Sequence, residues 1–379
     1  MSTSASHSPN AGRPLALRVD VALILTTLLV ACLGVVLVYS ATRSKLALAG
    51  INPHYFLTRQ AAYVVVGGAV MIVLAVLDYR WLEHASAVLY VVMILALLAM
   101  FAGIGTSALG ATRWVQLGPI QIQPSAFATL VLIVTVATFC ARRPDGLDRT
   151  DLLKVLALAA LPILLVVKQP DLGSGIVMCV VLLVMLVIAG IPNRYLMLLV
   201  LLVVVGAFAV VHFKLLKSYQ LGRLTALFQH GQNLQSTGYN VSQSVAAIGS
   251  GGLFGTGLFH GSQTNLAYVP EQQTDFIFSA VGEQLGFVGA AGVLALLGVL
   301  SWRVLRSAQL ARDPFGRLLA TGCFTLIAFS VFENAGMAMQ IMPVAGIPLP
   351  FLSYGGSATV AFFSAVGIAL SVQLRASSR

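Results

Sequence analysis

Residues 21–41, VALILTTLLVACLGVVLVYSA, decide the fold class, because the block contains no charged side chain and is long enough to cross a bilayer. A spanning helix needs about 20 mainly apolar residues. Comparable apolar blocks recur along the whole chain. We therefore predict about ten spanning helices, the others lying near residues 61–77, 86–103, 124–141, 152–167, 174–191, 195–213, 276–305, 318–339 and 358–374.

The composition supports the same fold class. Only 9% of the residues are Asp, Glu, Lys or Arg, against about 25% in a soluble domain. In lipid, the backbone polar groups must be satisfied within helices, and the alternating segments of a membrane barrel do not occur here. We predict an all-α integral membrane protein whose membrane domain spans residues 20–374. Residues 1–19 form a disordered cytoplasmic tail, and residues 375–379 a short cytoplasmic tail.

The net charge is +10, but the distribution of the basic residues indicates how the chain is oriented in the membrane and not a nucleic-acid partner. With ten spans and a cytoplasmic N-terminus, the densest basic clusters fall on the cytoplasmic side, as the positive-inside rule requires. Both termini are then cytoplasmic. These clusters comprise Arg142, Arg143, Arg149 and Lys154, and then Arg303, Arg306, Arg312 and Arg317.

Three connections on the opposite, outer side are long or irregular. They cover residues about 104–123, 214–274 and 340–357. The last contains PVAGIPLPFLSYGGS at 343–357, whose prolines and glycines forbid a regular helix. Irregular backbone at membrane depth is tolerated only where protein buries it or where it lines a wet cavity. We therefore expect the chemistry of this protein on its outer face.

Asp275 is the strongest catalytic candidate. It lies where a polar loop passes into an apolar helix, beside Phe276 and Phe278. One interpretation is a first-turn acid that complements the helix dipole, with Thr274 as the cap. The other is a general base in a partly apolar setting. The residues alone leave both open.

Four further acids are candidates, because ionisable residues at membrane depth are costly. Asp171 either pairs locally with Lys168 or contacts substrate. Glu283 either supports Asp275 or makes a structural hydrogen bond. Glu333, beside Asn334, more plausibly holds helices together, and Glu271 adjoins Asp275 in the chain.

Several templates are absent from the sequence. It contains no HExxH, no GxxxxGK[ST] and no GxSxG, which argues against a zincin, an ATP-driven pump and a serine hydrolase of those types. The histidines are scattered. The four cysteines lie in or beside apolar blocks without a CxxC spacing, so we interpret them as packing residues.

Taken together and in order, the outer-side motifs resemble the SEDS family, the RodA/FtsW/SpoVE group of bacterial cell-wall synthases. The resemblance runs from about residue 20 to 374. Three segments resemble RodA, the elongation member, more than FtsW: GYNVSQS at 238–244, GSQT at 261–264 and the Pro-Glu-Gln run at 270–272. The motifs are Asp20 with Tyr39-Ser40, Arg113-Trp114, QPS at 123–125, QPDLG at 169–173, IGSGGLFG at 248–255, Pro270-Glu271 with TDFIF at 274–278, Asn334 with Gly336-Met337, and GIPLPFLSYGGS at 346–357.

The resemblance implies a ten-helix peptidoglycan glycosyltransferase of the bacterial cytoplasmic membrane, which polymerises lipid II during cell elongation. It maps the family's essential acid onto Asp275 and its outer-loop tryptophan onto Trp114. We expect Asp275 to deprotonate the acceptor hydroxyl in one inverting displacement. The predicted substrate-binding residues are Asp171, Trp114, Arg113, Lys168, Glu271, Glu283, Arg223, Ser353 and Tyr354.

The resemblance also implies ligands and partners. Arg113, Lys168, Lys214, Lys217 or Arg223 is expected to steady the leaving pyrophosphate. A divalent cation, Mg²⁺ or Mn²⁺, is an alternative for that role. The implied partners are a class B penicillin-binding protein, which is a transpeptidase, and other membrane proteins of the elongation complex.

This sequence departs from the family pattern at three positions. The family usually has Glu and Lys where this chain has Ala126 and Thr129, which removes a helical ion pair. Gln273 stands where the family often has His. Two rival functions therefore stay open: a transporter of lipid-linked precursors, and a scaffold of the wall machinery without activity.

Overall fold

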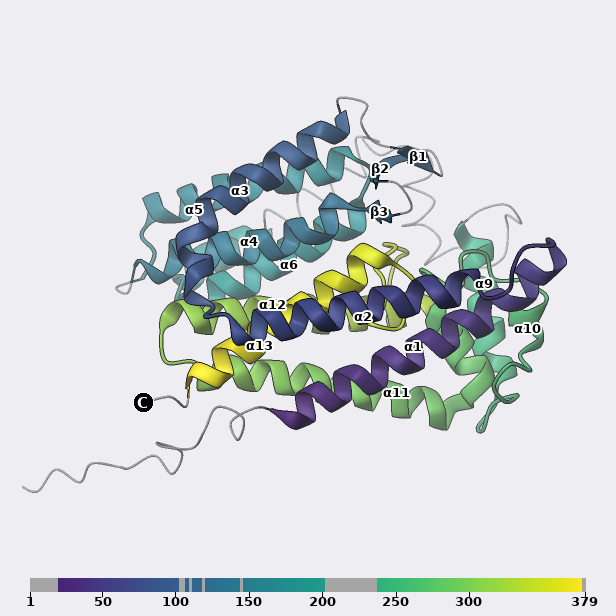
Figure 1. Ribbon diagram of the computed structural model, residues 1–379. Helices are drawn as coiled ribbons and strands as arrows, with labels where there is room; N and C mark the ends of the chain where they lie inside the picture. The colour runs from purple at the N-terminus through teal and green to yellow at the C-terminus, as the bar shows by residue number, and fades with distance from the viewer. Residues whose placement is uncertain are drawn as a thin grey trace, which may run out of the picture.

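The computed structural model describes residues 20–101, 106–108, 111–117, 120–143, 146–201 and 237–376. Most long helices run side by side through one bundle (Figure 1). The long helices are α1 (Val21–Leu48), α2 (Tyr55–Val76), α3 (Arg80–Phe101), α4 (Pro124–Ala141), α5 (Arg149–Lys168), α6 (Leu172–Ile188), α11 (Ile277–Leu310), α12 (Pro314–Ala338) and α13 (Gly356–Ala376).

The helical membrane fold is confirmed. Within the described ranges, α1–α5 and α11–α13 are long and apolar enough to cross a membrane, and α6 is apolar but shorter. The predicted span at 195–213 lies largely outside the described residues, which are helical from 193 to 201 before the gap. The count of ten spans therefore stays a prediction.

The sequence-based expectation of an all-α chain missed a small sheet. Strands β1 (Thr106–Ala108), β2 (Ala111–Leu117) and β3 (Ile120–Ile122) form an antiparallel meander between α3 and α4. Val115 of β2 lies opposite Ile122 of β3, a pair of β-branched residues of the kind enriched in strands. Of the predicted loop at 214–274, the part described contains helices α9 (Thr237–Ser250) and α10 (Ser262–Asn265).

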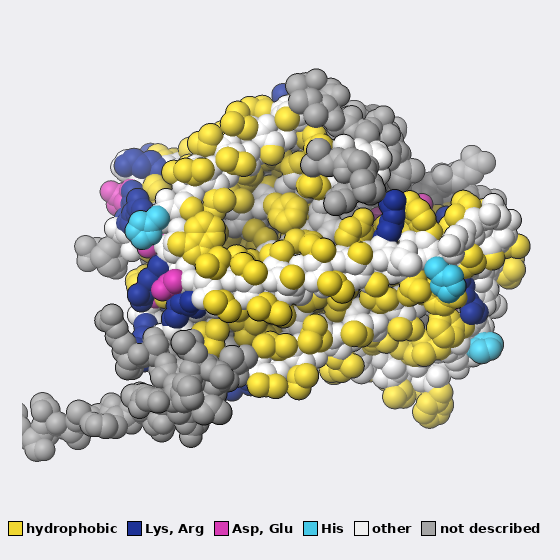
Figure 2. All heavy atoms as spheres, viewed as in Figure 1, with side chains coloured by type: hydrophobic (Ala, Val, Ile, Leu, Met, Phe, Trp, Pro, Cys, Tyr) yellow, Lys and Arg dark blue, Asp and Glu magenta, His cyan; other side chains and the backbone are white. Residues whose placement is uncertain are grey.

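The two ends of the bundle differ in character. One, the sheet end, carries β1–β3, α9, α10 and the turn between α1 and α2 (Figure 1). The other, the basic end, carries the turns from α2 to α3, α4 to α5 and α11 to α12. Lys and Arg side chains gather at the basic end (Figure 2), where Arg80, Arg142 and Arg312 lie at helix ends. This charge asymmetry is what the positive-inside pattern predicts.

Helices α4, α12 and α13 form the interior. The apolar windows of α4, α12 and α13 are 67%, 67% and 78% buried, against 22% for α2 and α3. The apolar side chains that α2 and α3 leave exposed, such as Val65 and Val88, are those expected to face lipid hydrocarbon.

Helix α11 breaks near its start, at Gly286, where φ is +66°. A Cβ atom there would lie 2.2 Å from the amide nitrogen of Gly255, so only glycine fits. The amide groups of Phe287 and Val288 donate instead to the carbonyl oxygens of Gly252 (2.9 Å) and Leu253 (3.1 Å). The break therefore fixes the 252–255 loop against α11, at the sheet end.

A buried ion pair closes the basic end. Asp20 caps α1 by accepting from the Leu23 amide (3.0 Å), and it also binds the Arg303 guanidinium of α11 and the Gln373 amide of α13 (3.2 Å). Burial raises the pKa of Asp20, but the hydrogen bonds from Arg303, Leu23 and Gln373 outweigh it and hold the pKa below its usual value. One carboxylate thus ties three helices together.

We expect Asp20→Asn to lower the free energy of unfolding by about 1–3 kcal/mol, because the Arg303 guanidinium loses a buried acceptor. Because the folded pKa is depressed, the stabilisation is present above the unfolded pKa and is lost as the pH falls through the folded pKa. Thermal unfolding in detergent at neutral and acidic pH measures both effects. The control is Asp78→Asn, because the half-exposed Asp78 carboxylate lies 3.4 Å from Arg375 Nε. A loss of stability as large in this variant would contradict the role assigned to the buried Asp20.

Candidate functional site

Asp275 lies at the sheet end, half-buried, in the turn that precedes α11. Its amide donates to the Glu271 carbonyl oxygen (3.1 Å), and its own carbonyl oxygen accepts from Asn334 Nδ2 (2.8 Å). The capping interpretation is wrong, because α11 begins at Ile277 with Phe276 as its N-cap residue. The Thr274 hydroxyl donates to the Glu271 carbonyl oxygen instead (3.0 Å). The aspartate is therefore held by its backbone, outside the helix.

The irregular segment 343–355 is buried beside this turn, as the sequence predicts. Asn334 Nδ2 also donates to the Ile347 carbonyl oxygen (2.8 Å), so one amide of α12 fixes both the Asp275 turn and this segment. A Cβ atom on Gly34 of α1 would lie 2.2 Å from the Phe351 carbonyl oxygen, and one on Gly173 of α6 2.5 Å from that of Ala345. Glycines on two helices thus admit the segment into the bundle.

Tyr354 connects the segment to α2. Its amide donates to the Gln273 carbonyl oxygen (2.8 Å), two residues from Asp275. Its hydroxyl is hydrogen-bonded to Arg59, and burial, followed by the fields of nearby tyrosines, raises the pKa of Tyr354 to about 12. The Arg59 guanidinium also stacks over the Tyr55 ring, 4.4 Å from its centroid. Tyr354 therefore links Arg59, through its side chain, to the Asp275 turn, through its backbone.

Sequence reasoning missed Arg59. The helix begins at Tyr55, whereas the predicted span began at residue 61, so Arg59 was assigned to a connection. The available signal was an ionisable residue flanking an apolar block. Its neighbour Gln60 is buried, and its side chain reaches the Ser353 carbonyl oxygen (3.3 Å) and the Gly355 amide (3.5 Å).

The Asp171 carboxylate is occupied by structural donors. It caps α6 through Ser174, whose hydroxyl donates at 2.9 Å, and it accepts from Ser125 Oγ (2.7 Å) and Gln123 Nε2 (3.2 Å) at the start of α4. Lys168 is exposed and lies in the last turn of α5. Asp171 therefore joins α4 to α6 rather than forming the local pair with Lys168.

Glu283 is also structural in its contacts. It is completely buried and accepts from the Gln263 amide (2.7 Å), the Thr264 amide (3.0 Å) and the Thr264 hydroxyl (2.6 Å) at the start of α10. The structural alternative stated for Glu283 is thus the one that its geometry supports. Its carboxylate fixes α10 against α11.

Glu333 and Glu271 lie next to the Asp275 turn. Glu333 is buried, and its Oε1 accepts from the Ala345 amide (3.2 Å), so it ties α12 to the irregular segment; the role of holding helices together stays a prediction. Its Oε2 has no hydrogen-bond partner among the described residues. Glu271 is half-buried with φ of +50°, and its side chain accepts from Gln273 Nε2 (3.2 Å).

Of the other predicted substrate-binding residues, only some lie within the described part of the chain. Trp114 is half-buried on β2, which packs against α3 and α4. Ser353 is buried, and its hydroxyl accepts from the Leu349 amide (2.9 Å), a contact within its own segment. The side chain of Arg113, and all of Lys214, Lys217 and Arg223, lie outside the described residues.

The chain is similar to known proteins of one family. The profile of the cell cycle proteins FtsW, RodA and SpoVE matches residues 20–378. The chain belongs to the FtsW/RodA/SpoVE family. A relative in Geobacter metallireducens, named as a probable peptidoglycan glycosyltransferase FtsW, is 37% identical over 94% of this chain and 95% of its own length. The peptidoglycan glycosyltransferase MrdB of Escherichia coli is 38% identical over 83% of this chain and 84% of its own length.

Solved structures show the same family fold. One, described as a peptidoglycan synthase complex that coordinates polymerization and crosslinking, has a TM-score of 0.80 and 29% identity, and the match covers 94% of this chain and 98% of that one. The Thermus thermophilus rod shape determining protein RodA has a TM-score of 0.69 and 28% identity, with 95% and 98% covered. The described helices thus share the arrangement of the FtsW/RodA/SpoVE family.

Two of the three departures from the family pattern lie inside α4, and the third, Gln273, is buried in the turn before α11. Ala126 packs against the core and Thr129 is buried, so the positions of the usual Glu and Lys carry side chains without charge. In the described part of the chain, no group of three His, Cys, Asp or Glu residues is placed to hold a metal ion. The predicted Mg²⁺ or Mn²⁺ stays a prediction, because Mg²⁺ is usually held by one or two carboxylates together with substrate phosphates.

Proposed function

We propose that this chain is a peptidoglycan glycosyltransferase, which polymerises lipid II at the outer face of the bacterial cytoplasmic membrane, with Asp275 as the general base. The observation that carries the proposal is a half-buried aspartate at the sheet end, held through its backbone on Asn334 and Glu271, in a turn that Tyr354 links to Arg59. The names of the family relatives as glycosyltransferases support the activity.

The chemistry follows from these groups. Asp275 accepts the proton of the acceptor sugar hydroxyl, the resulting oxygen forms a bond to the anomeric carbon of the donor, and the bond to the lipid pyrophosphate breaks with inversion. Arg59 is placed to hold the departing pyrophosphate through charge-assisted hydrogen bonds. The Tyr354 phenol, whose raised pKa keeps it neutral, holds that guanidinium in position.

The proposed orientation places the sheet end outside and both termini in the cytoplasm, because the basic end follows the positive-inside rule. For the partner, we propose a class B penicillin-binding protein. Support comes from the structural relative described as a complex that couples polymerization to crosslinking.

The cellular role is either elongation or division. The motifs of the 238–272 region favour elongation, whereas relatives named FtsW favour division. Localising a fluorescent fusion distinguishes them: signal along the side wall supports elongation, and signal confined to the septum supports division.

The structure offers little support for the transporter alternative. Asp171, Glu283 and Glu333 would be the coupling or pathway acids. The oxygens of Asp171 and Glu283 already accept from fixed hydroxyl and amide donors, whereas Glu333 Oε2 has no hydrogen-bond partner among the described residues. The contacts of Asp171 and Glu283 anchor helix starts.

The test of the proposed function is glycan polymerisation from purified lipid II by the full chain in detergent, with and without its penicillin-binding partner. The expected result is polymer that electrophoresis resolves as a ladder of glycan lengths. Folded protein that binds its partner, yields no polymer and instead moves lipid II across vesicles would overturn the proposal.

We expect Arg59→Gln to lower the polymerisation rate about 10–100-fold, which corresponds to the loss of one or two charge-assisted hydrogen bonds to pyrophosphate. The initial rate of lipid II consumption measures it. Lys45→Gln is the matched control, since it removes a charge from an exposed side chain near the same end of the bundle. Equal rates for the two variants would contradict a phosphate role for Arg59.

A further inference from the structure

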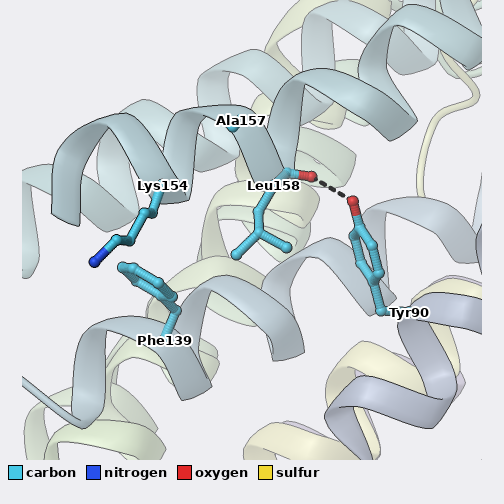
Figure 3. A pocket seen from close by; sticks show the side chains of 5 residues that line it. All are labelled: Tyr90, Phe139, Lys154, Ala157 and Leu158. Atoms are coloured by element: carbon cyan, nitrogen blue, oxygen red, sulfur yellow. Dashed lines mark hydrogen bonds between the residues drawn. The ribbon is translucent and has the colours of Figure 1, made fainter. Parts of the chain in front are cut away.

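A groove opens between α3, α4 and α5, close to the basic end of the bundle. It has a volume of about 460 Å³ and is lined by Tyr90, Phe139, Lys154, Ala157 and Leu158 (Figure 3). Lys154 lies in the second turn of α5, and Phe139 in the last turn of α4. Val88 and Leu153, on the flanking helices, are 66% and 59% exposed. The groove therefore faces the lipid, far from the Asp275 turn.

The wall of the groove suits hydrocarbon. The Tyr90 hydroxyl donates to the Leu158 carbonyl oxygen (2.8 Å), so the polar groups of these two wall residues satisfy each other. Phe139, Ala157 and the Leu158 side chain supply apolar surface. In a bilayer, an apolar groove left unfilled would lose dispersion contacts along its whole length. A lipid acyl chain is the neighbour that restores these contacts.

The mouth of the groove carries unbalanced positive charge. Asp151 Oδ1 is 2.7 Å from Arg143 Nε and 3.8 Å from Lys154 Nζ, so one carboxylate serves two cations. Arg143 is further held over the Phe139 ring, 3.6 Å from its centroid, and donates to the Phe139 carbonyl oxygen. The Lys154 side chain is 58% exposed, against 25% for Arg143. Lys154 is therefore the cation available to an external anion.

A neighbouring pair does not change this balance. Arg142 lies 3.5 Å from Glu83, so these two charges offset each other at the same rim. Arg143 and Lys154 carry two positive charges and Asp151 one negative charge, so this group leaves one net positive charge beside the apolar groove. Basic pockets between membrane helices are typical binding sites for anionic lipid head groups.

We propose that this groove binds an anionic phospholipid from the leaflet next to the basic end. An acyl chain lies along Phe139, Ala157 and Leu158, and the phosphate is held by Lys154. The site is separate from the one that binds lipid II, and its occupancy couples the packing of α3, α4 and α5 to the composition of the membrane.

The test uses native mass spectrometry of the full-length protein in detergent, supplied with phosphatidylglycerol or with phosphatidylcholine of identical acyl chains. Wild type is expected to retain phosphatidylglycerol about fivefold better, the effect of one cation on a net anionic head group, because the choline of phosphatidylcholine offsets the charge of its own phosphate. Lys154→Gln should bring this ratio close to one. Ala157→Trp, which fills the groove but keeps the charge, should lower retention of both lipids.

The matched control is Arg306→Gln, which removes one exposed charge from α11, on another side of the bundle (Figure 1). It should keep the wild-type ratio. The proposal is overturned if Lys154→Gln keeps the preference, or if Arg306→Gln loses as much.

A photo-crosslinking residue at position 157, used in bacterial membranes, identifies the occupant in place. An adduct with phospholipid supports the proposal. An adduct with another protein assigns the groove to a partner helix and overturns it.

Discussion

We expect Asp275→Asn to abolish glycan polymerisation and to leave the protein folded. The substitution keeps the shape of the side chain but removes the proton acceptor, and a general base contributes on the order of 10²–10⁴-fold to a rate. The backbone contacts that hold this turn, from Asn334 and to Glu271, do not involve the carboxylate. Polymerisation from purified lipid II and thermal unfolding of the same preparation measure the two halves of the prediction.

Asp171→Asn is the matched comparison for Asp275→Asn. It makes the same chemical change at the same end of the bundle, on a carboxylate that accepts from Ser125, Gln123 and Ser174. We expect it to lower stability, with activity per folded molecule retained. A well-folded Asp275→Asn protein that still polymerises would refute the base. Full loss of activity in folded Asp171→Asn would instead support the predicted contact between Asp171 and substrate.

The sequence was sufficient for the helices because hydrophobic length alone determines them. The blocks at 124–141 and 318–339 correspond to α4 and α12 with small shifts at their ends. Burial of the 343–355 segment also followed from its prolines and glycines, since irregular backbone cannot face lipid. The sheet β1–β3 was missed because its strands are short and lie inside a connection, where apolar alternation is weak.

The roles of individual acids needed the structure. In sequence, Asp171 and Glu283 resemble Asp275: each is an acid near the end of an apolar block. What separates them is the set of donors brought by distant segments, such as Ser125 for Asp171 and Thr264 for Glu283. Arg59 shows the reverse case, because its link to the Asp275 turn passes through Tyr354, almost 300 positions away in the chain. No local pattern encodes such contacts.

Asn334→Leu should cost the enzyme most of its rate while removing less of its stability. The Asn334 amide is the shared donor to the carbonyl oxygens of Asp275 and Ile347, so its loss loosens the Asp275 turn on the buried segment, which the Tyr354 amide still holds through the Gln273 carbonyl oxygen. A displacement of about 1 Å at a reacting group can lower a rate about 100-fold. The expected signature is a lower kcat with KM nearly unchanged, because the residue positions the base and does not itself contact substrate.

For Asn334→Leu we expect a smaller effect on stability than on rate, because two contributions to the free energy of unfolding oppose each other. Each freed carbonyl oxygen costs about 1–3 kcal/mol if left unpaired, but Asn334 Oδ1 already has no partner among the described residues, and leucine removes that buried acceptor. Ser330→Ala is the control on α12: its hydroxyl is buried and donates within its own helix, to the Leu326 carbonyl oxygen (2.7 Å). It should lower stability slightly and leave kcat intact. If Asn334→Leu keeps the wild-type kcat while Ser330→Ala does too, Asn334 is merely a packing residue, and the remaining contacts of the Asp275 turn, such as those with Glu271 and Tyr354, suffice to hold it.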